Sequence, residues 1–342
     1  MIRQTTIILL SFLIFTISSC KPDNEIPIPI ESVPLFQVPS HFPDPIYQFS
    51  NNKLTKEGFE LGKSLFYETL LSSTNNISCG SCHSAVHAFA DHGAKFSAGV
   101  NNQLSSRNSP TLSNLAWYPN FMWDGGVNHI EVMPVAPITN PIEMNETMQN
   151  VVDKLSNESK YPVLFKNAFG NTTITDQKIL FALAQFMGSM VSATSKYDEV
   201  KTGKSVFTET EAAGYEIFKL KCNACHTEPL FTNFTYQSNG LDLNPNDLGR
   251  ALITQQVEDE GKFKVPTLRN IDLTGPFMHD GRFSNLNQVL NFYSIDIKAH
   301  NNLSSNLPIG GLQLSTQEKS QIVEFLKTLN DYSYISDQRF AE

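Results

Sequence analysis

Two five-residue segments of this 342-residue chain combine side chains that bind cofactors or metals. Residues 79–83 read Cys-Gly-Ser-Cys-His, and residues 222–226 read Cys-Asn-Ala-Cys-His. Two thiols three positions apart reach the two vinyl groups of one haem, and the histidine that follows lies beneath the iron as its proximal ligand. The sequence therefore predicts two covalently attached c-type haems. The residues that hold them are Cys79, Cys82, His83, Cys222, Cys225 and His226.

The same segments have alternatives among metal and redox sites. Four thiolates form a structural zinc site in other proteins, and a Cys-x-x-Cys pair alone also serves in thiol–disulfide exchange. The histidine after each pair favours haem over both alternatives. A haem iron with an occupied sixth position transfers electrons, whereas an iron with an open sixth position binds peroxide or oxygen.

The N-terminus has the layout of an export signal. Arg3 gives a basic start, residues 7–17 form an apolar run, and two serines precede Cys20. The apolar run is shorter than the about 20 residues that span a membrane. A cysteine directly after two small residues is typical of a bacterial lipoprotein, so we expect residues 1–20 to be the signal and Cys20 to be acylated. An ordinary cleaved signal with an incidental cysteine is the alternative.

All five cysteines are then assigned, one to lipid and two pairs to haem. Hydrophobic residues make up 40% of the chain and charged residues 17%, which is typical of a soluble globular protein. The formal net charge of −9 argues against a nucleic-acid partner. Since c-type haem is attached outside the cytoplasm, we expect a periplasmic protein that meets a bacterial membrane only through its lipid anchor.

Helices and loops must position the two haem segments. Residues 21–45 contain seven prolines and predict an extended tether rather than a helix. Residues 62–66 and 214–218 share a Gly-x-x-aliphatic-Phe pattern ahead of each haem segment, which indicates two related haem-binding units in tandem. We place one domain at 46–200 and the other at 201–342.

Three further helices are visible in the sequence. Capping-box patterns at 208–211 and 315–318 predict a helix over 212–220 and a final helix near the C-terminus. Apolar residues at helical spacing predict another helix between about 176 and 195. Alternating strand patterns are not evident, so the predicted class is mainly α with long loops.

Five phrases surround the haem segments in a specific order. They are Arg-Asn-Ser-Pro-Thr at 107–111, Phe-Met-Trp-Asp-Gly-Gly at 121–126, Asn-Pro-Ile-Glu-Met at 140–144, Val-Pro-Thr-Leu-Arg-Asn at 265–270 and Gly-Pro-Phe-Met-His-Asp-Gly at 275–281. Over residues 50–330 the chain resembles the bacterial di-haem cytochrome c peroxidases and their relative MauG, which matures a tryptophan-derived cofactor. The resemblance implies two tandem cytochrome c-like domains, the N-terminal one peroxidatic and the C-terminal one electron-transferring.

The resemblance implies roles near the N-terminal haem. Trp123 would lie between the haems and relay electrons, and Glu143 would be the distal acid that moves a proton between the oxygens of peroxide. Without the resemblance, Trp123 reads as a core residue and Glu143 as a helix-start carboxylate. Met133 stands where the family has glutamine and Gly126 where relatives often carry arginine, whereas Pro137 matches the family's proline on the peroxide side.

The resemblance also implies a sixth ligand for the C-terminal haem. Counting fourteen residues from His279 leads to Tyr293, where classical peroxidases have methionine and MauG has tyrosine. Tyr293 is therefore the expected iron ligand, and Met278 is the rival because thioether is the usual c-type ligand. A structural tyrosine with another sixth ligand is the remaining possibility.

The N-terminal haem is expected to be open or easily opened. Peroxidases of the family have a distal histidine on the loop after the haem segment, and this loop offers His87 and His92. His87 lies too close to the proximal His83 to reach the opposite face of the same haem. His92 remains a candidate ligand, with a surface loop histidine as the alternative, but it comes earlier than the family's spacing. The Phe-Ala-Asp sequence at 89–91 is closer to the MauG branch.

Asn108, Thr274 and Pro276 match the family's calcium site between the domains. Calcium accepts amide and backbone carbonyl oxygens, with waters completing the shell. Three uncharged turn residues are the alternative.

The sequence thus predicts a lipid-anchored di-haem peroxidase, with a homodimer as a further expectation from the family. Hydrogen peroxide would bind at the N-terminal iron, and electrons from a small cytochrome c or cupredoxin would enter at the C-terminal haem. The first alternative is a MauG-like oxidase that acts on a protein or organic substrate through a high-valent haem pair. The second alternative is a non-catalytic di-haem electron carrier.

Overall fold

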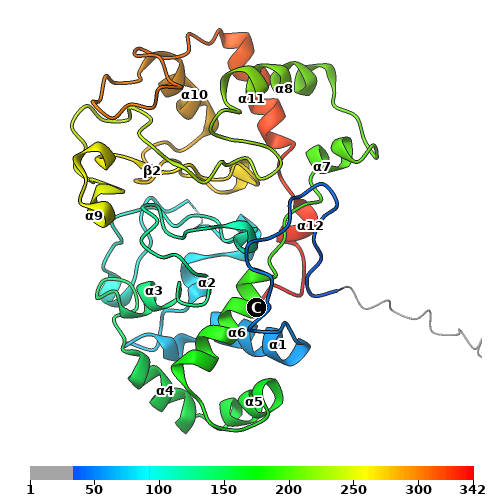
Figure 1. The fold of residues 1–342 in the computed structure, drawn as a ribbon, viewed down its shortest axis with the longest axis vertical. Coiled ribbons are helices and arrows are strands. Elements are labelled where there is room, and N and C mark those ends of the chain that lie inside the picture. The colour runs from blue at the N-terminus through cyan, green and yellow to red at the C-terminus, as the bar shows by residue number, and fades with distance from the viewer. Residues whose placement is uncertain (1–33, 92) are drawn as a thin grey trace, which may run out of the picture. The chain divides into compact units, whose positions relative to one another are not determined.

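Helices and long loops make up most of the described chain, with little sheet (Figure 1). The computed structural model describes residues 34–91 and 93–342. The predicted signal, Cys20, most of the predicted tether and His92 lie outside the described residues. No helix within the two described ranges is long and apolar enough to cross a membrane.

The α-helices follow one another along the chain, interrupted by loops and 3-10 turns. They are α1 (Lys56–Phe66), α2 (Cys79–Cys82), α3 (Val135–Thr139), α4 (Met148–Asn157), α5 (Lys160–Phe169), α6 (Asp176–Gly188), α7 (Lys196–Lys201), α8 (Glu209–Lys221), α9 (Ala251–Thr254), α10 (Leu286–Ile295), α11 (Thr316–Lys327) and α12 (Tyr332–Ile335). The 3-10 turns are Thr69–Leu71, Ala85–His87, Val100–Asn102, Leu115–Trp117, Val257–Asp259 and Ile271–Leu273. Strands β1 (Tyr236–Gln237) and β2 (Phe263–Lys264) pair antiparallel.

The predicted helix starts are confirmed, and one predicted helix end is wrong. Capping boxes at 208–211 and 315–318 open α8 and α11, because each N-cap hydroxyl and the glutamate three residues later bind each other's backbone N–H. Helix α6 ends at Gly188 rather than near residue 195. The residues 189–195 are rich in serine and threonine, which favour caps and turns, and Ser195 already caps α7.

Two glycines of the sequence repeat occupy equivalent packing positions. A Cβ atom added to Gly62 in α1 would lie 2.0 Å from the carbonyl oxygen of Ala182 in α6. A Cβ atom added to Gly214 in α8 would lie 2.0 Å from the carbonyl oxygen of Gln321 in α11. The missing side chains therefore let α1 approach α6 and α8 approach α11, so the repeat marks two helix pairs of the same build.

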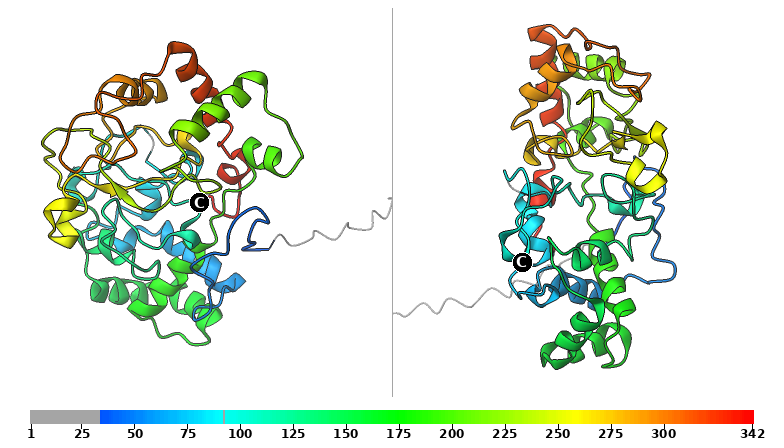
Figure 2. Two further views of the ribbon diagram at one scale, coloured as in Figure 1. Left: turned by 45° about the horizontal axis from the view of Figure 1, so that its top comes forward. Right: turned by 90° about the vertical axis from the view of Figure 1, so that its left-hand side faces the viewer.

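The hydrophobic side chains gather in two large clusters. One contains buried residues from Phe59 to Met190 together with Tyr334 and Phe340, and the other contains buried residues from Tyr197 to Leu329. Elements before α7 and elements from α8 to α11 occupy different parts of the unit in both ribbon figures (Figures 1 and 2). Residues Leu35–Glu342 nevertheless form one compact unit, and a domain boundary near residue 200 stays a prediction.

The last part of the predicted tether packs on the folded unit. Phe42 is buried with its ring 5.2 Å from the ring of Trp117, whose Nε1 donates a hydrogen bond to the carbonyl of Pro43 at 2.8 Å. The Nε2 of His41 lies 2.8 Å from Oδ1 of Asp198, which also forms a buried ion pair with Arg269. Residues from 35 onward are thus part of the fold.

We predict that Gly62→Ala lowers the free energy of unfolding by about 1–3 kcal/mol, because the added methyl group meets a backbone carbonyl that cannot rotate away. Glu60→Ala, on the exposed side of the same helix, is the matched control. Denaturant unfolding of the haem-loaded protein measures the difference. Equal midpoints for the two variants would contradict the close approach of α1 to α6.

Candidate functional site

A cavity of about 1120 Å³ collects the residues singled out in the sequence. The four cysteines and two histidines of the Cys-x-x-Cys-His segments all line it, together with residues from both hydrophobic clusters. Its volume exceeds the roughly 300–1,000 Å³ of most single-ligand pockets. The four thiols in the described chain form no disulfide. The cavity therefore has the size and the reactive groups for more than one covalently held cofactor.

The two segments place their thiols and imidazoles by the same helical turn. In the first segment the N–H of His83 donates to the carbonyl of Cys79 at 2.9 Å, and in the second the N–H of His226 donates to the carbonyl of Cys222 at 3.0 Å. These i to i+4 bonds keep the cysteines of each segment one helical turn apart. Each segment thus presents its three side chains to the cavity as one unit.

Backbone carbonyls orient both histidine rings. The Nδ1 of His83 lies 2.7 Å from the carbonyl oxygen of Phe89, and the Nδ1 of His226 lies 3.1 Å from those of Phe231 and Pro266. A proton on Nδ1 that is donated to a carbonyl leaves the Nε2 lone pair for a metal. Burial lowers the pKa of both imidazoles, which favours the neutral form that a metal ligand requires.

The backbone around the ring-orienting carbonyls of Phe89 and Phe231 has the same conformation and the same hydrogen bond in both segments. Phe89 and Phe231 both adopt left-handed backbone conformations, with φ of 59° and 55°. The hydroxyls of Thr111 and Thr267 each donate at 2.6 Å to the carbonyl just before the phenylalanine. Both threonines lie in phrases already noted in the sequence, but this role was not predicted. The signal for it is the Pro-Thr-Leu sequence, which occurs at 110–112 and again at 266–268.

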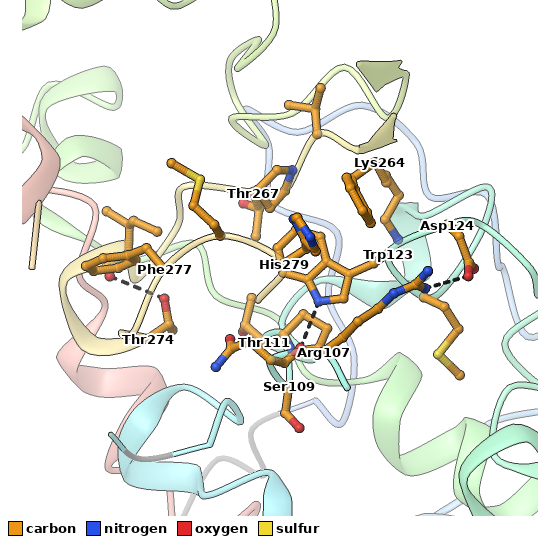
Figure 3. A pocket seen from close by; sticks show the side chains of 18 of the residues that line it. Arg107, Ser109, Thr111, Trp123, Asp124, Lys264, Thr267, Thr274, Phe277 and His279 are labelled. Atoms are coloured by element: carbon orange, nitrogen blue, oxygen red, sulfur yellow. Dashed lines mark hydrogen bonds and ion pairs between the residues drawn. The ribbon is translucent and has the colours of Figure 1, made fainter. Parts of the chain in front are cut away.

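Trp123 lines the cavity where backbone from distant parts of the chain meets. Its Nε1 donates to the carbonyl of Asn108 at 2.8 Å, and its own carbonyl accepts the N–H of Lys264 at 2.7 Å. The N–H of Asn108 donates in turn to the carbonyl of His279 at 2.7 Å. Figure 3 shows Trp123, Lys264 and His279 together among the side chains that line the cavity. The indole is therefore held by segments from both halves of the chain.

Charged side chains surround this tryptophan. The guanidinium of Arg107 donates to both carboxylate oxygens of Asp247 at 2.7 and 2.9 Å. It also donates to Oδ2 of Asp124 at 2.5 Å, as Figure 3 shows. Asp124 also caps its own loop by accepting the N–H of Gly126 at 2.9 Å. Lys264, which the sequence analysis did not single out as a charge, donates to a backbone carbonyl, and burial lowers its pKa to about 7.

Glu143 adds a carboxyl group to an apolar stretch of the cavity wall. Its Oε1 accepts a hydrogen bond from Nδ2 of Asn140 at 2.7 Å, and its carbonyl accepts the N–H of Val100 at 2.8 Å. Met133 and Pro137 line the same cavity. Burial raises the pKa of the Glu143 carboxyl above its ordinary value, so a proton is held there at higher pH than on an exposed glutamate.

Tyr293 and Met278 line the cavity together and meet at Asn239. The Nδ2 of Asn239 lies 3.3 Å from the Tyr293 hydroxyl oxygen and 3.5 Å from the Met278 sulfur. Burial raises the pKa of Tyr293 to about 12. The structure thus brings the expected ligand and its rival together. It also adds Asn239, which no sequence pattern marked.

The three residues predicted to bind calcium also line the cavity. The Nδ2 of Asn108 donates to the carbonyl of Ala94 at 3.2 Å, and the hydroxyl of Thr274 donates to the carbonyl of Ile271 at 3.2 Å. The part of the chain that the structure describes holds no group of three or more histidine, cysteine, aspartate or glutamate side chains placed for a metal ion. A calcium ion here would depend on amide and carbonyl oxygens, Pro276 included.

Comparison with known proteins places this cavity among di-haem enzymes. The family model described as di-haem cytochrome c peroxidase matches residues 56–206. The methylamine utilization protein MauG of Methylophilus methylotrophus is 33% identical over 302 residues, which cover 86% of this chain and 88% of that protein. The cytochrome c551 peroxidase of Nitrosomonas europaea is 34% identical over 281 residues, which cover 79% of each chain.

Solved structures give the same picture at the level of the fold. The crystal structure of a MauG-like protein associated with microbial copper homeostasis has a TM-score of 0.81 and 30% sequence identity, covering 89% of this chain and 97% of that one. The diheme peroxidase BthA from Burkholderia thailandensis has a TM-score of 0.72 at 21% identity, covering 82% and 87% of the two chains. The second likeness concerns the fold alone.

Replacing both cysteines of one segment should leave one haem per chain instead of two, because each pair holds its own cofactor. Absorbance of the haem and the mass of the denatured chain measure this for Cys79→Ala/Cys82→Ala and for Cys222→Ala/Cys225→Ala. Each double variant serves as the control for the other. Zinc in place of covalent haem in the unmodified protein, which keeps all four thiols, would support the four-thiolate zinc site instead.

Proposed function

Because this chain belongs to the di-haem cytochrome c peroxidase family, which includes MauG among its relatives, we propose that it reduces hydrogen peroxide with electrons from a small redox protein. It is an oxidoreductase with two c-type haems. One observation carries the proposal. Both haem segments, Trp123 and Glu143 line one cavity, so one cavity collects groups suited to hold the haems, relay electrons and move a proton.

The residues around the cavity fit two haems. Each segment offers two thiols for thioether bonds and an imidazole whose Nδ1 already faces a carbonyl. The wall around them is largely apolar, as a porphyrin ring requires. The haem supplies the iron at which peroxide binds and its O–O bond is cleaved. The steps below concern what this chain's own side chains do.

Glu143 is proposed to carry the proton. Oxygen Oε1 is engaged by Asn140, so Oε2 is the atom that takes a proton from the inner oxygen of peroxide and returns it to the outer one, which leaves as water. The buried side chain of Met133 and the adjacent Pro137 keep bulk water from competing for that proton. The side chain of Pro137 provides no ligand atom for iron, which supports an N-terminal iron with an open sixth position.

Trp123 is proposed to relay electrons between the haems. Its N–H is donated to an amide carbonyl, which is too weak a base to remove a proton when the indole gives up an electron. The indole therefore keeps its proton, and the electron transfer stays reversible. The nearby carboxylates of Asp124 and Asp247 are both bound by Arg107 and are not free to accept that proton.

Tyr293 is proposed as the sixth ligand of the C-terminal haem, with Met278 as its rival. Its hydroxyl group lines the cavity, and the hydroxyl oxygen accepts a hydrogen bond from Nδ2 of Asn239 at 3.3 Å. Among described residues, the histidines that line the cavity are His83, His226 and His279. His92, the candidate sixth ligand of the N-terminal haem, lies outside the described residues and stays a prediction.

A MauG-like oxidase is the second candidate. The tyrosine at position 293, rather than methionine, and the 33% identity to MauG over 86% of the chain favour it. Such an enzyme would act on a protein or organic substrate and would react with peroxide in its fully oxidised state. A non-catalytic electron carrier, in contrast, would need both irons tightly closed.

Localisation and partners are also proposals. The apolar N-terminal run and Cys20 support export and a lipid anchor on a bacterial membrane, with a small cytochrome c or cupredoxin as electron donor. Asn108, Thr274 and Pro276 are proposed to bind one Ca²⁺ through uncharged oxygens. A homodimer is expected from the family.

Peroxide consumption tests the main proposal. The purified haem-loaded protein, reduced by a small c-type cytochrome, should oxidise that donor in step with added hydrogen peroxide. Activity that begins only after one-electron reduction supports the peroxidase. Activity of the fully oxidised protein toward a protein or organic substrate supports the oxidase. Ferric irons that are both six-coordinate and unmoved by cyanide would rule out both.

Glu143→Gln should lower kcat for peroxide by about 10²–10⁴-fold, since the amide cannot accept a proton. The reaction needs the carboxylate form, so wild-type activity should fall as pH drops through the raised pKa of Glu143. That loss should begin at a higher pH than for an exposed glutamate, and the variant should lack it. Glu158→Gln, an exposed change of the same type, is the control for the pH profile of kcat.

Trp123→Phe should slow electron transfer between the haems by roughly tenfold or more, a barrier increase of at least ~1.4 kcal/mol. Phenylalanine is harder to oxidise, while peroxide binding at the first iron should not change. The other tryptophan of the chain, Trp117, packs in a separate cluster and gives the matched control Trp117→Phe. Stopped-flow oxidation of the reduced protein by peroxide measures the rate. Equal rates in the two variants would remove Trp123 from the path.

A further inference from the structure

Residues 108–140 and 264–296 are two copies of one backbone segment, offset by 156 positions. Phe121-Met-Trp-Asp-Gly in the first copy corresponds to Phe277-Met-His-Asp-Gly in the second. Met122 and Met278 share a left-handed conformation, with φ of 66° and 73°. The loop is closed in each copy by a backbone hydrogen bond of 2.7 Å, from Phe121 to Val127 in the first and from Phe277 to Phe283 in the second. Helices α3 and α10 also end at equivalent positions.

The two copies also bind each other reciprocally. The N–H of Asn108 donates to the carbonyl of His279, and the N–H of Lys264 donates to the carbonyl of Trp123, both at 2.7 Å. Lys264 is the equivalent of Asn108, and His279 is the equivalent of Trp123. The exchange of partners means that the copies are related by an approximate two-fold axis. Residues 156 positions apart therefore occupy equivalent places around their own haem segments.

This equivalence identifies the residue of the first half that corresponds to Tyr293, the proposed ligand of the C-terminal haem. The equivalent of Tyr293 is Pro137, which has no donor atom for iron. A neighbouring loop repeats too, with a different offset. A Cβ atom on Gly99 would lie 2.1 Å from the carbonyl oxygen of Ile142, and one on Gly240 would lie 2.7 Å from the carbonyl oxygen of Lys298, which is the equivalent of Ile142.

The residues that precede Gly99 and Gly240 also differ in polarity, with the polar residue again in the second half. They are Ala98 in the first half and Asn239 in the second. The second half thus has an amide and a phenol where the first half has a methyl group and a proline ring. The two positions are thus polar in the second half and apolar in the first. In the second half, the side chains of Asn239 and Tyr293 contact each other.

The orientation of the Asn239 amide follows from its other contact. Its Oδ1 accepts the N–H of Leu241 at 3.2 Å, so Nδ2 is the atom that faces Tyr293 and Met278. Its two N–H groups serve two acceptors, the Tyr293 hydroxyl oxygen and the Met278 sulfur. A donor aimed at the tyrosine oxygen stabilises the anionic phenolate, which is the form that binds ferric iron. A donor aimed at the sulfur occupies one of its two lone pairs and holds the thioether beside Asn239, which disfavours Met278 as the iron ligand.

We propose that Asn239 is the positioning residue that selects Tyr293 over Met278 as the sixth ligand of the C-terminal haem. Its replacement by Ala98 in the other half, together with Pro137 at the ligand position, leaves the N-terminal iron open. The inference rests on the proposed assignment of Tyr293 as an iron ligand. Two pairs of equivalent positions, Ala98 with Asn239 and Pro137 with Tyr293, then decide which iron meets peroxide.

Cyanide binding to the fully oxidised, haem-loaded protein tests this, because cyanide competes with the sixth ligand. Electron paramagnetic resonance separates the two ferric haems. Asn239→Leu should raise the affinity of the C-terminal haem for cyanide by about tenfold or more, the usual effect of losing a hydrogen bond to a charged acceptor. The phenolate-to-iron absorption should weaken as well. Asn246→Leu, an exposed change in the same cavity-lining loop, should leave both unchanged.

Tyr293→Phe separates the inference from the ligand assignment. If this variant opens the C-terminal haem and Asn239→Leu behaves like the wild type, the role of Asn239 is overturned while the tyrosine ligand stands. If Tyr293→Phe leaves the C-terminal haem unchanged, the ligand assignment and this inference fail together. The peroxide assay judges the proposed peroxidase activity independently of both.

The reverse exchange gives a gain-of-function test that does not depend on Asn239→Leu folding. Ala98→Asn combined with Pro137→Tyr gives the first half the two residues of the second. This variant should lower the affinity of the N-terminal haem for cyanide by about tenfold or more and should add phenolate-to-iron absorption. A folded double variant with an unchanged N-terminal haem would overturn the claim that these two positions decide the outcome.

Discussion

The reciprocal backbone pairing between residues 108–123 and 264–279 is the interaction on which the rest of the site depends. Asn108 and Lys264 donate to the carbonyls of His279 and Trp123 at the same distance, so each copy of the repeated segment is held by the other. The indole is placed between the halves by that pairing and by its own bond to Asn108. The pairing thus joins two segments that both line the one cavity.

Each half adds the same machinery around this pairing. A threonine hydroxyl holds the carbonyl before a phenylalanine, and the phenylalanine carbonyl receives the Nδ1 of the ligand histidine. The chain of contacts runs from a Pro-Thr-Leu sequence to the imidazole in both halves. The geometry of the proximal side is therefore duplicated. We propose that differences between the two haems arise on the opposite side, for which Pro137 and Tyr293 are the proposed residues.

The sequence was most informative where the chemistry is local. The haem segments and the capping boxes of α8 and α11 depend on residues a few positions apart. The glycine of each helix pair was visible as part of a short repeated pattern, although it packs against a carbonyl far along the chain. Asn239 and the charge of Lys264 escaped notice because their partners lie far along the chain: Asn239 contacts Tyr293 54 positions away. The end of α6 was missed because a run of apolar residues continues past Gly188, whereas serine and threonine side chains redirect the backbone.

A duplicated scaffold with one reactive copy places opposite demands on equivalent positions. The reactive site needs an acid near the open iron, and Glu143 follows Pro137 by six residues in a wall of apolar side chains. The electron-holding site needs a ligand that stays bound, and a buried tyrosine with a fixed amide donor at its oxygen meets that need. The central pair diverges in the same way, since Trp123 is an oxidisable ring and its equivalent His279 instead stacks on Phe263 with ring centroids 3.8 Å apart. The proposed division of labour therefore requires few changes to the shared backbone, because it is set by side chains at positions that the two-fold pairing already makes equivalent.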